Sequence, residues 1–333
     1  MLFYLILFMS IMFQISSTTW FSLWVAMEMN LLSFIPLLSN PKNMLFNEGP
    51  MKYFLIQAFG SVILLMGWLM NSYSYLNNMY LFSMSNVIFY ISLMLKLGAA
   101  PFHFWFPSLM ENMSWLNSFL LMTWQKLGPL ILLTYISKLL FFLMMSSFFS
   151  SLVGGLGGLN QVSMRKIFAY SSIGHISWLL MSLMLNELNF ILYYLFYFFM
   201  MFLFSLIFYL NLISSLMQLL FYKESFYMEK FFIMLSFLSL GGMPPLSGFF
   251  VKWMILNSLL IMNIWFISFV MLFSTLINLY YYIRIFYSTM MLSNFSPMMI
   301  SFKFSFKYLY LIKLIILMMM FSVLFIPIGI WVL

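Results

Sequence analysis

The chain has 333 residues, of which 65% are hydrophobic and 6% are charged, and its mean hydropathy is +1.07. A soluble domain carries about 25% charged residues, so this composition excludes a soluble enzyme and a disordered tail. The absence of cysteine excludes disulfides, thiolate zinc sites and cysteine-ligated iron–sulfur clusters. The formal net charge is +8, but no basic cluster exceeds the Arg165–Lys166 pair, so nucleic-acid binding is not indicated.

These properties predict an all-α polytopic membrane protein. A membrane-spanning helix needs about 20 predominantly apolar residues. Cutting the sequence at its polar and Gly/Pro-rich connections predicts eleven spans, of which the first has no signal-peptide features. They cover residues 1–16, 19–38, 51–70, 84–106, 115–137, 139–159, 166–185, 190–212, 231–262, 263–287 and 308–330.

The loop charges predict the orientation of these spans. Lys and Arg in short loops are retained on the side from which a chain is inserted. When the eleven spans alternate, nine basic loop residues lie on one side and Lys138 alone lies on the other. The nine are Lys42, Lys52, Arg165, Lys166, Lys223, Lys230, Arg284, Lys303 and Lys307. The N-terminus is therefore expected on the basic, matrix-like side and the C-terminus on the opposite side.

Four charged residues, Glu28, Lys96, Lys126 and Lys252, fall near the middle of predicted spans. A charge at the bilayer centre costs about 2.5 to 3.5 kcal/mol on insertion scales, so unpaired charges there require an explanation. Snorkelling operates near helix ends, whereas these residues are flanked by long apolar stretches. Structural ion pairs remain an alternative, although three lysines do not balance one glutamate. We favour functional ionisable residues.

Two of the lysines lie beside predicted helix breaks. Pro101 follows Lys96, and a segment rich in glycine and proline at 241–248 precedes Lys252. Interrupted spans in corresponding positions of two halves mark the binding sites of inverted-repeat transporters, although ordinary proline kinks are the alternative. The fourth and ninth spans are five apart, which predicts two inverted five-helix repeats. Within a single transmembrane domain, these repeats cover about 1–137 and 139–287, with an extra C-terminal helix at about 308–330.

The seventh span carries Ser171 and His175, which are four residues apart and therefore share one helix face. A lone membrane histidine is often a packing residue, but this pair is also a candidate proton relay.

Gly154 and Gly158 have the spacing of close helix packing rather than that of a dinucleotide-binding loop. Two distant histidines without aspartate give no plausible metal site.

At these residues the sequence resembles the antiporter-like subunits of respiratory complex I, NADH:ubiquinone oxidoreductase, in particular the chain 2 subunits of animal mitochondria. The excess of Phe, Met, Tyr and Asn is also typical of an AT-rich genome such as mitochondrial DNA. The matching stretches cover about a quarter of the chain and occur in the expected order. They are WVAMEMNLLSFIPLL from Trp24, LKLGAAPFHFW from Leu95, LMTWQKLGPL from Leu121, GGLGGLNQVSMRKIFAYSSIGHISW from Gly154 and LGGMPPLSGFFVKWM from Leu240.

The resemblance implies that Glu28 and Lys96 form the glutamate–lysine pair of a first half-channel. It also implies that Lys126 is the central relay and that Lys252 serves the second half-channel. The sister chain 4 has glutamate at the last of these positions, so lysine favours chain 2. Burial disfavours a charged lysine and a nearby carboxylate favours it. Movement of Glu28 relative to Lys96 is therefore expected to switch proton affinity, with Ser171 and His175 as further relay candidates.

The resemblance further implies a proton-translocating subunit of the mitochondrial inner membrane, surrounded by lipid and by other membrane-arm subunits, including antiporter-like chains. No cofactor is expected on this chain, because NADH, FMN, iron–sulfur clusters and ubiquinone act in other parts of the complex. A free-standing cation/proton antiporter shares this core and is the alternative function. A third interpretation is a structural subunit whose lysines are vestigial or bind anionic lipid.

Overall fold

The structure is a computed structural model that describes residues 2–39, 48–77, 79–136, 140–220, 227–244 and 246–291. These ranges contain helices and no β-strand, which confirms the predicted all-α class. Contacts divide the chain into two compact units, Met1–Ser150 and a second unit from Ser151 onward. Each unit is described by itself. The predicted repeat boundary near residue 138 stays a prediction, and the predicted span 308–330 lies outside the described residues.

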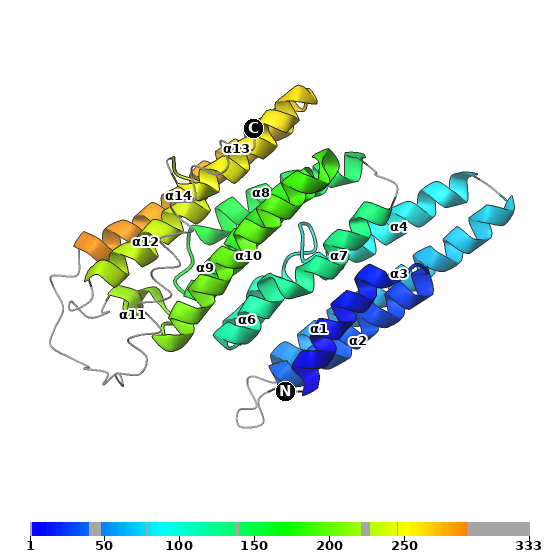
Figure 1. Ribbon diagram of the computed structural model, residues 1–333, viewed down its shortest axis with the longest axis horizontal. Coiled ribbons are helices and arrows are strands. Elements are labelled where there is room, and N and C mark those ends of the chain that lie inside the picture. The colour runs from blue at the N-terminus through cyan, green and yellow to red at the C-terminus, as the bar shows by residue number, and fades with distance from the viewer. Residues whose placement is uncertain are drawn as a thin grey trace. The chain divides into compact units, whose positions relative to one another are not determined.

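The described residues of the first unit form seven complete helices. Figure 1 shows how they follow one another along the chain. They are α1 (Leu2–Ser16), α2 (Trp20–Leu38), α3 (Glu48–Asn77), α4 (Met79–Leu97), α5 (Trp105–Glu111), α6 (Trp115–Met122) and α7 (Trp124–Tyr135). Helix α1 packs on α2, α3 packs on α4, and α7 contacts both α1 and α4. Helix α7 therefore lies against helices from the beginning and the middle of this unit.

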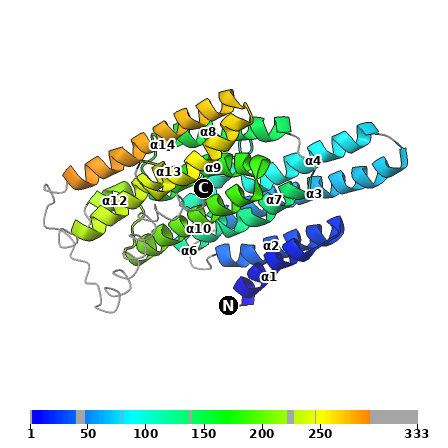
Figure 2. The ribbon, with the colours of Figure 1, turned by 45° about the horizontal axis from the view of Figure 1, so that its top comes forward.

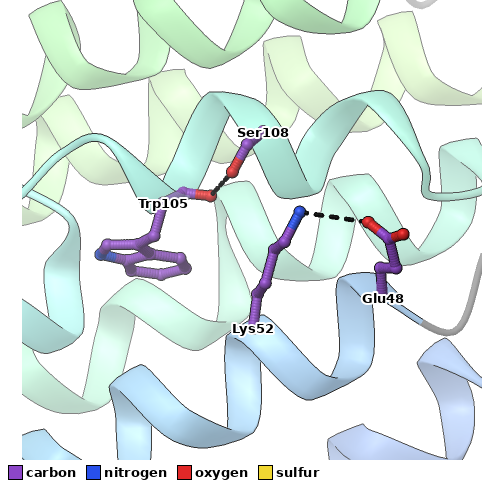
Figure 3. A network of polar contacts seen from close by, with 4 residues as sticks. All are labelled: Glu48, Lys52, Trp105 and Ser108. Atoms are coloured by element: carbon purple, nitrogen blue, oxygen red, sulfur yellow. Dashed lines mark hydrogen bonds and ion pairs between the residues drawn. The ribbon is translucent and has the colours of Figure 1, made fainter.

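Polar residues mark where two helices of this unit begin. Thr19 is the N-cap of α2, and its Oγ1 accepts a hydrogen bond of 3.3 Å from the backbone N–H of Ser22. Helix α3 begins at Glu48, whose Oε2 lies 3.4 Å from Nζ of Lys52 one turn later (Figure 3). Both of these side chains are more than half exposed, so the pair contributes little stability. This exposed pair contrasts with the buried lysines described below.

The predicted fourth span is interrupted where Gly and Pro indicated a break. Helix α4 ends at Leu97, and Gly98 has a φ of +67°, a left-handed conformation that favours glycine. The Ala99 N–H then donates to the Met94 carbonyl at 3.2 Å, which closes the helix. The chain resumes as the separate helix α5 at Trp105, so residues 84–106 are not one continuous helix.

The predicted fifth span is also divided, and here the sequence analysis expected one helix over 115–137. Helices α6 and α7 meet at Thr123, which has φ −115° and ψ −74°. The Thr123 hydroxyl donates to the Phe119 carbonyl at 2.8 Å, and the backbone N–H of Thr123 bonds the same carbonyl. Such side-chain bonds compete with the regular helix and bend it. The break places Lys126 in the first turn of α7.

The second unit contains the later helices and the end of α8 (Leu140–Gly158), which crosses the unit boundary. The others are α9 (Met164–Leu185), α10 (Glu187–Leu210), α11 (Leu216–Leu220), α12 (Tyr227–Gly241), α13 (Ser247–Ile261) and α14 (Trp265–Met291). Helix α9 is the core of this unit, since 89% of its most apolar segment is buried and it contacts α10, α13 and α14 (Figure 2).

Six of the described helices are long and apolar enough to cross a membrane. They include α2, α9 and α10, which match predicted spans closely. Helices α12 and α13, each of 15 residues, are shorter because the ninth span is interrupted. The described residues therefore support a polytopic membrane protein with broken helices, and the total of eleven spans stays a prediction.

Candidate functional site

Lys96 lies at the broken end of α4, and only 8% of it is exposed. Its Nζ is 3.3 Å from the sulfur of Met27 on α2. Its backbone carbonyl accepts a hydrogen bond of 3.3 Å from the Gln57 amide of α3. A Cβ added at Gly60 would lie 3.2 Å from Cγ of Lys96, so the absence of a side chain there makes room for the lysine stem. Three helices therefore hold this lysine in place.

Glu28 is adjacent to Met27 on α2 and is partly buried. Its carboxylate interacts electrostatically with Lys96, but the two side chains form no direct ion pair among the residues that the structure describes. Oε1 of Glu28 is buried and has no hydrogen-bond partner in the described part of the chain. An unsatisfied buried acceptor costs about 1 to 3 kcal/mol, and more when it is charged. The carboxylate therefore has a free acceptor for a proton or a water molecule.

Lys126 is the most deeply buried of the candidate lysines, with 2% of the residue exposed. Its Nζ lies 4.9 Å from the centre of the Phe106 ring, a distance suitable for a cation–π contact. Pro129 follows within α7 and supplies no backbone N–H, so the helix leaves the carbonyl of Gln125 without its usual donor. The lysine is thus beside a locally weakened helix.

A small cavity, lined by both apolar and polar side chains, reaches Lys96 and Lys126. Its volume is about 20 Å³, and since one water needs roughly 10 to 15 Å³, it has room for a single water. In the lining of this cavity, the Gln125 amide donates to Oδ1 of Asn30 at 3.0 Å. The Tyr53 hydroxyl donates to Oε1 of Gln125 at 3.4 Å. A chain of hydrogen-bonded polar groups therefore lines part of the cavity that both lysines reach.

The polar residues that line this cavity were missed by the sequence analysis, which singled out charged residues and the Ser171–His175 pair. Asn30, Gln57 and Gln125 all lie within predicted apolar spans, and two of them, Asn30 and Gln57, are less than a tenth exposed. An amide inside an apolar span is itself a signal, because its buried polar atoms need partners. Applying that rule to Asn and Gln predicts these lining positions.

Lys252 lies in α13, and 6% of it is exposed. Its Nζ donates hydrogen bonds to the carbonyls of Leu240 at 2.9 Å and Gly241 at 2.8 Å. These carbonyls lack helical donors because α12 ends at Gly241, where Gly242 turns the chain with a φ of +84°. The ammonium therefore takes the place of the missing backbone donors at the break, which explains how a lysine is tolerated there.

Ser171 and His175 lie on α9 and are almost completely buried. Nδ1 of His175 is 2.7 Å from the hydroxyl of Tyr193 on α10, and the Tyr197 ring is 5.1 Å away. The Ser171 hydroxyl donates to the Phe168 carbonyl at 3.0 Å. His175 is thus a hydrogen-bonded core histidine, and the same bond gives it a proton-exchanging neighbour.

The candidate residues are divided between the two units. Glu28, Lys96 and Lys126 lie in the first unit, and Ser171, His175 and Lys252 lie in the second.

The glycine run in α8 also has the expected packing role, since a Cβ at Gly154 would lie 2.6 Å from the Gly174 Cα of α9. Over the described ranges, no group of three His, Asp or Glu side chains is placed to hold a metal ion.

Comparison with known families and proteins gives consistent matches. Residues 17–278 match the family described as NADH:quinone oxidoreductase/Mrp antiporter. NADH-ubiquinone oxidoreductase chain 2 of Anopheles gambiae is 43% identical over 300 residues, which is 88% of this chain and 86% of the mosquito protein. The same subunit of Canis lupus is 38% identical over 279 residues, covering 82% and 80% of the two chains.

Solved structures match in fold. A chain of respiratory complex I from Thermus thermophilus superposes with a TM-score of 0.84 at 20% identity, covering 98% of this chain and 78% of the other. A chain of the Mrp complex from Dietzia sp. gives a TM-score of 0.74 at 16% identity, covering 86% and 59%. These two chains therefore share the overall fold of this protein.

Proposed function

Because this chain belongs to the NADH:quinone oxidoreductase/Mrp antiporter family, and within it to the chain 2 subunits of NADH-ubiquinone oxidoreductase, we propose a proton path through its buried charges. The chain is a proton-translocating membrane subunit of respiratory complex I. The observation that carries this function is 43% identity to a chain 2 subunit across most of both proteins. The buried lysines then supply the groups that bind and release the proton.

In the first unit, we propose that Glu28 and Lys96 control the proton on Lys126. The apolar surroundings disfavour a charged lysine, and a carboxylate nearby favours it. Glu28 has a free buried oxygen and interacts with Lys96 without a direct ion pair, so a small movement changes how strongly it holds the ammonium. The cavity between Lys96 and Lys126 has room for the water that such a transfer requires.

In the second unit, the proposed acceptor is Lys252, with Ser171 and His175 as relay residues. The proton leaving Lys126 passes to this group and then to the opposite side of the membrane. Two of the three N–H groups of the Lys252 ammonium donate hydrogen bonds to backbone carbonyls, so the third proton is available for exchange. His175 is bonded to the Tyr193 hydroxyl, and both groups donate and accept protons.

This chain is proposed to bind no cofactor of its own. Electron transfer from NADH through FMN and iron–sulfur clusters to ubiquinone occurs in other subunits of the complex. The role of this chain is then to convert a conformational or electrostatic signal into proton movement. This assignment rests on the family, and the absence of cysteine is consistent with it because no thiolate is present to ligate a cluster.

The protein is a multi-pass mitochondrial membrane protein and a member of a multisubunit membrane complex. We place it in the inner membrane, with its N-terminus in the matrix and its C-terminus in the intermembrane space. The nine-to-one distribution of basic loop residues supports this orientation. Its expected neighbours are membrane lipids and other antiporter-like chains of the membrane arm. We expect it to bind no nucleic acid.

Co-migration with the active complex tests the function directly. Mitochondrial membranes are solubilised in a mild detergent, separated on a native gel and stained for NADH dehydrogenase activity. We expect peptides of this chain, identified by mass spectrometry, in the large active band. Recovery of the chain only in a small, inactive species would contradict the assignment and would instead favour a free-standing cation/proton antiporter.

Replacement of Glu28 tests the switch in the first unit. Glu28→Gln keeps the size of the side chain but removes its charge, so Lys96 loses the carboxylate that acts on it. We expect coupled turnover to fall by roughly tenfold, equivalent to about 1.4 kcal/mol in the rate-limiting barrier. The measurement is NADH-driven proton uptake in vesicles, normalised to assembled complex on native gels.

Glu48→Gln is the matched control, because Glu48 is an exposed glutamate at the start of α3 whose side chain is 63% exposed (Figure 3). This variant is expected to pump normally. Equal coupled turnover in the Glu28 and Glu48 variants would refute the proposed switch. A loss of assembled complex in the Glu28 variant alone would show a structural role instead.

A further inference from the structure

Helix α14 carries a buried polar stripe that the sequence analysis did not single out. Asn278, Tyr281 and Tyr282 are spaced three and four residues apart, so they share one helix face. They are 8%, 1% and 1% exposed, whereas the neighbouring Tyr280 is 61% exposed. The helix therefore directs two tyrosines and an amide into the second unit and one tyrosine outward.

Three polar atoms of this stripe have no hydrogen-bond partner in the part of the chain that the structure describes. Oδ1 of Asn278 and the hydroxyls of Tyr281 and Tyr282 are buried and unbonded among the described residues. Tyr282 lies close to Tyr281 and to Ser171, but none of these contacts has the geometry of a hydrogen bond. Buried polar groups are almost always bonded to protein or to ordered water. Buried hydroxyls without a protein partner are therefore expected to bind water.

One end of the stripe lies at the helix break that holds Lys252. A Cβ added at Gly241 would be 3.3 Å from the Tyr282 ring. A Cβ added at the next residue, Gly242, would be 3.0 Å from Nζ of Lys252. Tyr282 and Lys252 thus contact consecutive residues of the same turn, and the two glycines leave room for both side chains.

The other end of the stripe lies beside the relay candidates of α9. The Nδ2 atom of Asn278 would be 3.1 Å from a Cβ at Gly174, the residue before His175. The Tyr282 phenol also interacts electrostatically with that of Tyr193, which is the hydrogen-bond partner of His175. The stripe therefore extends from the His175 region to the Lys252 break within one unit.

We propose that Asn278, Tyr281 and Tyr282 form a water-binding site that positions a proton path between His175 and Lys252. A phenol hydroxyl accepts a proton from a bound water on one side and releases its own proton on the other. Each transfer breaks one O–H or N–H bond and forms another, so no oxidant or reductant is needed. The inference rests on the proposed function, because it assigns the route by which Lys252 exchanges its proton.

The test compares three tyrosine variants in the assembled complex. Tyr281→Phe and Tyr282→Phe, alone and combined, remove only hydroxyls and keep the packed rings. We expect the double variant to lower the ratio of protons pumped per electron to the value of a Lys252→Met variant, while the amount of assembled complex stays unchanged. Tyr280→Phe removes an exposed hydroxyl from the same helix and is expected to keep the normal ratio.

The outcomes separate this inference from the function on which it rests. If Lys252→Met lowers the ratio and the double tyrosine variant does not, the water path is wrong and the function stands. If Lys252→Met also keeps the normal ratio, the proposed role of Lys252 fails and the inference fails with it. If the double variant loses assembly but each assembled complex pumps normally, the tyrosines serve only packing and the inference is overturned.

Discussion

Lys126→Met is expected to abolish proton pumping through this subunit while the complex still assembles. Methionine matches the length and volume of lysine, and the site is apolar apart from its polar cavity, so packing around Phe106 is preserved. What is lost is the one group in α7 that can carry a proton beside the cavity. The free-energy barrier for a proton to cross the resulting gap is high, because a charge in apolar surroundings at the bilayer centre costs several kcal/mol.

The measurement is the number of protons moved per NADH oxidised in vesicles that contain the purified complex. We expect this ratio to fall by the share that this subunit contributes, with the native-gel band unchanged. Lys52→Met provides the control, because the Lys52 side chain is 53% exposed and lies at a helix start. An unaltered ratio in the Lys126 variant would refute its role as the central relay.

The charged residues were predictable because charge is rare in this chain. Only 6% of the residues are charged, so a lysine in the middle of an apolar span stands out without any knowledge of the fold. The breaks beside Lys96 and Lys252 were predictable as well, since Pro101 and the glycine- and proline-rich segment 241–248 do not sustain a regular helix. The sequence therefore predicts which residues carry charge and where the backbone around two of them is opened.

The polar residues around those charges were harder to predict. Asn and Tyr are abundant here, so Asn30 in α2 and Tyr282 in α14 resemble ordinary members of apolar helices. Their function depends on which helix face is buried, and the helices carry no clear amphipathic pattern because lipid and protein interior are both apolar. The break at Thr123 was missed for a related reason, since one threonine hydroxyl bonded to Phe119 replaces the usual Gly and Pro signals.

The glycine run of α8 determines how closely the helices of the second unit approach. A Cβ at Gly154 would lie 2.5 Å from the backbone nitrogen and 2.6 Å from the Cα of Gly174 on α9. These are backbone atoms, which cannot rotate aside, so any side chain at Gly154 must displace α9. That helix carries Ser171 and His175 and is the most buried helix of its unit. Packing at Gly154 therefore sets the position of the relay residues.

Gly154→Ala is accordingly expected to destabilise the second unit by about 1 to 3 kcal/mol, the usual cost of overpacking. We expect less assembled complex on native gels and faster thermal loss of NADH-driven pumping. Gly155→Ala is a matched control from the same turn, because its Cβ would meet no atom closer than 3.4 Å, which is ordinary contact. Similar assembly and heat resistance in the two variants would show that α8 and α9 separate without cost. The close contact at Gly154 would then not be what positions His175.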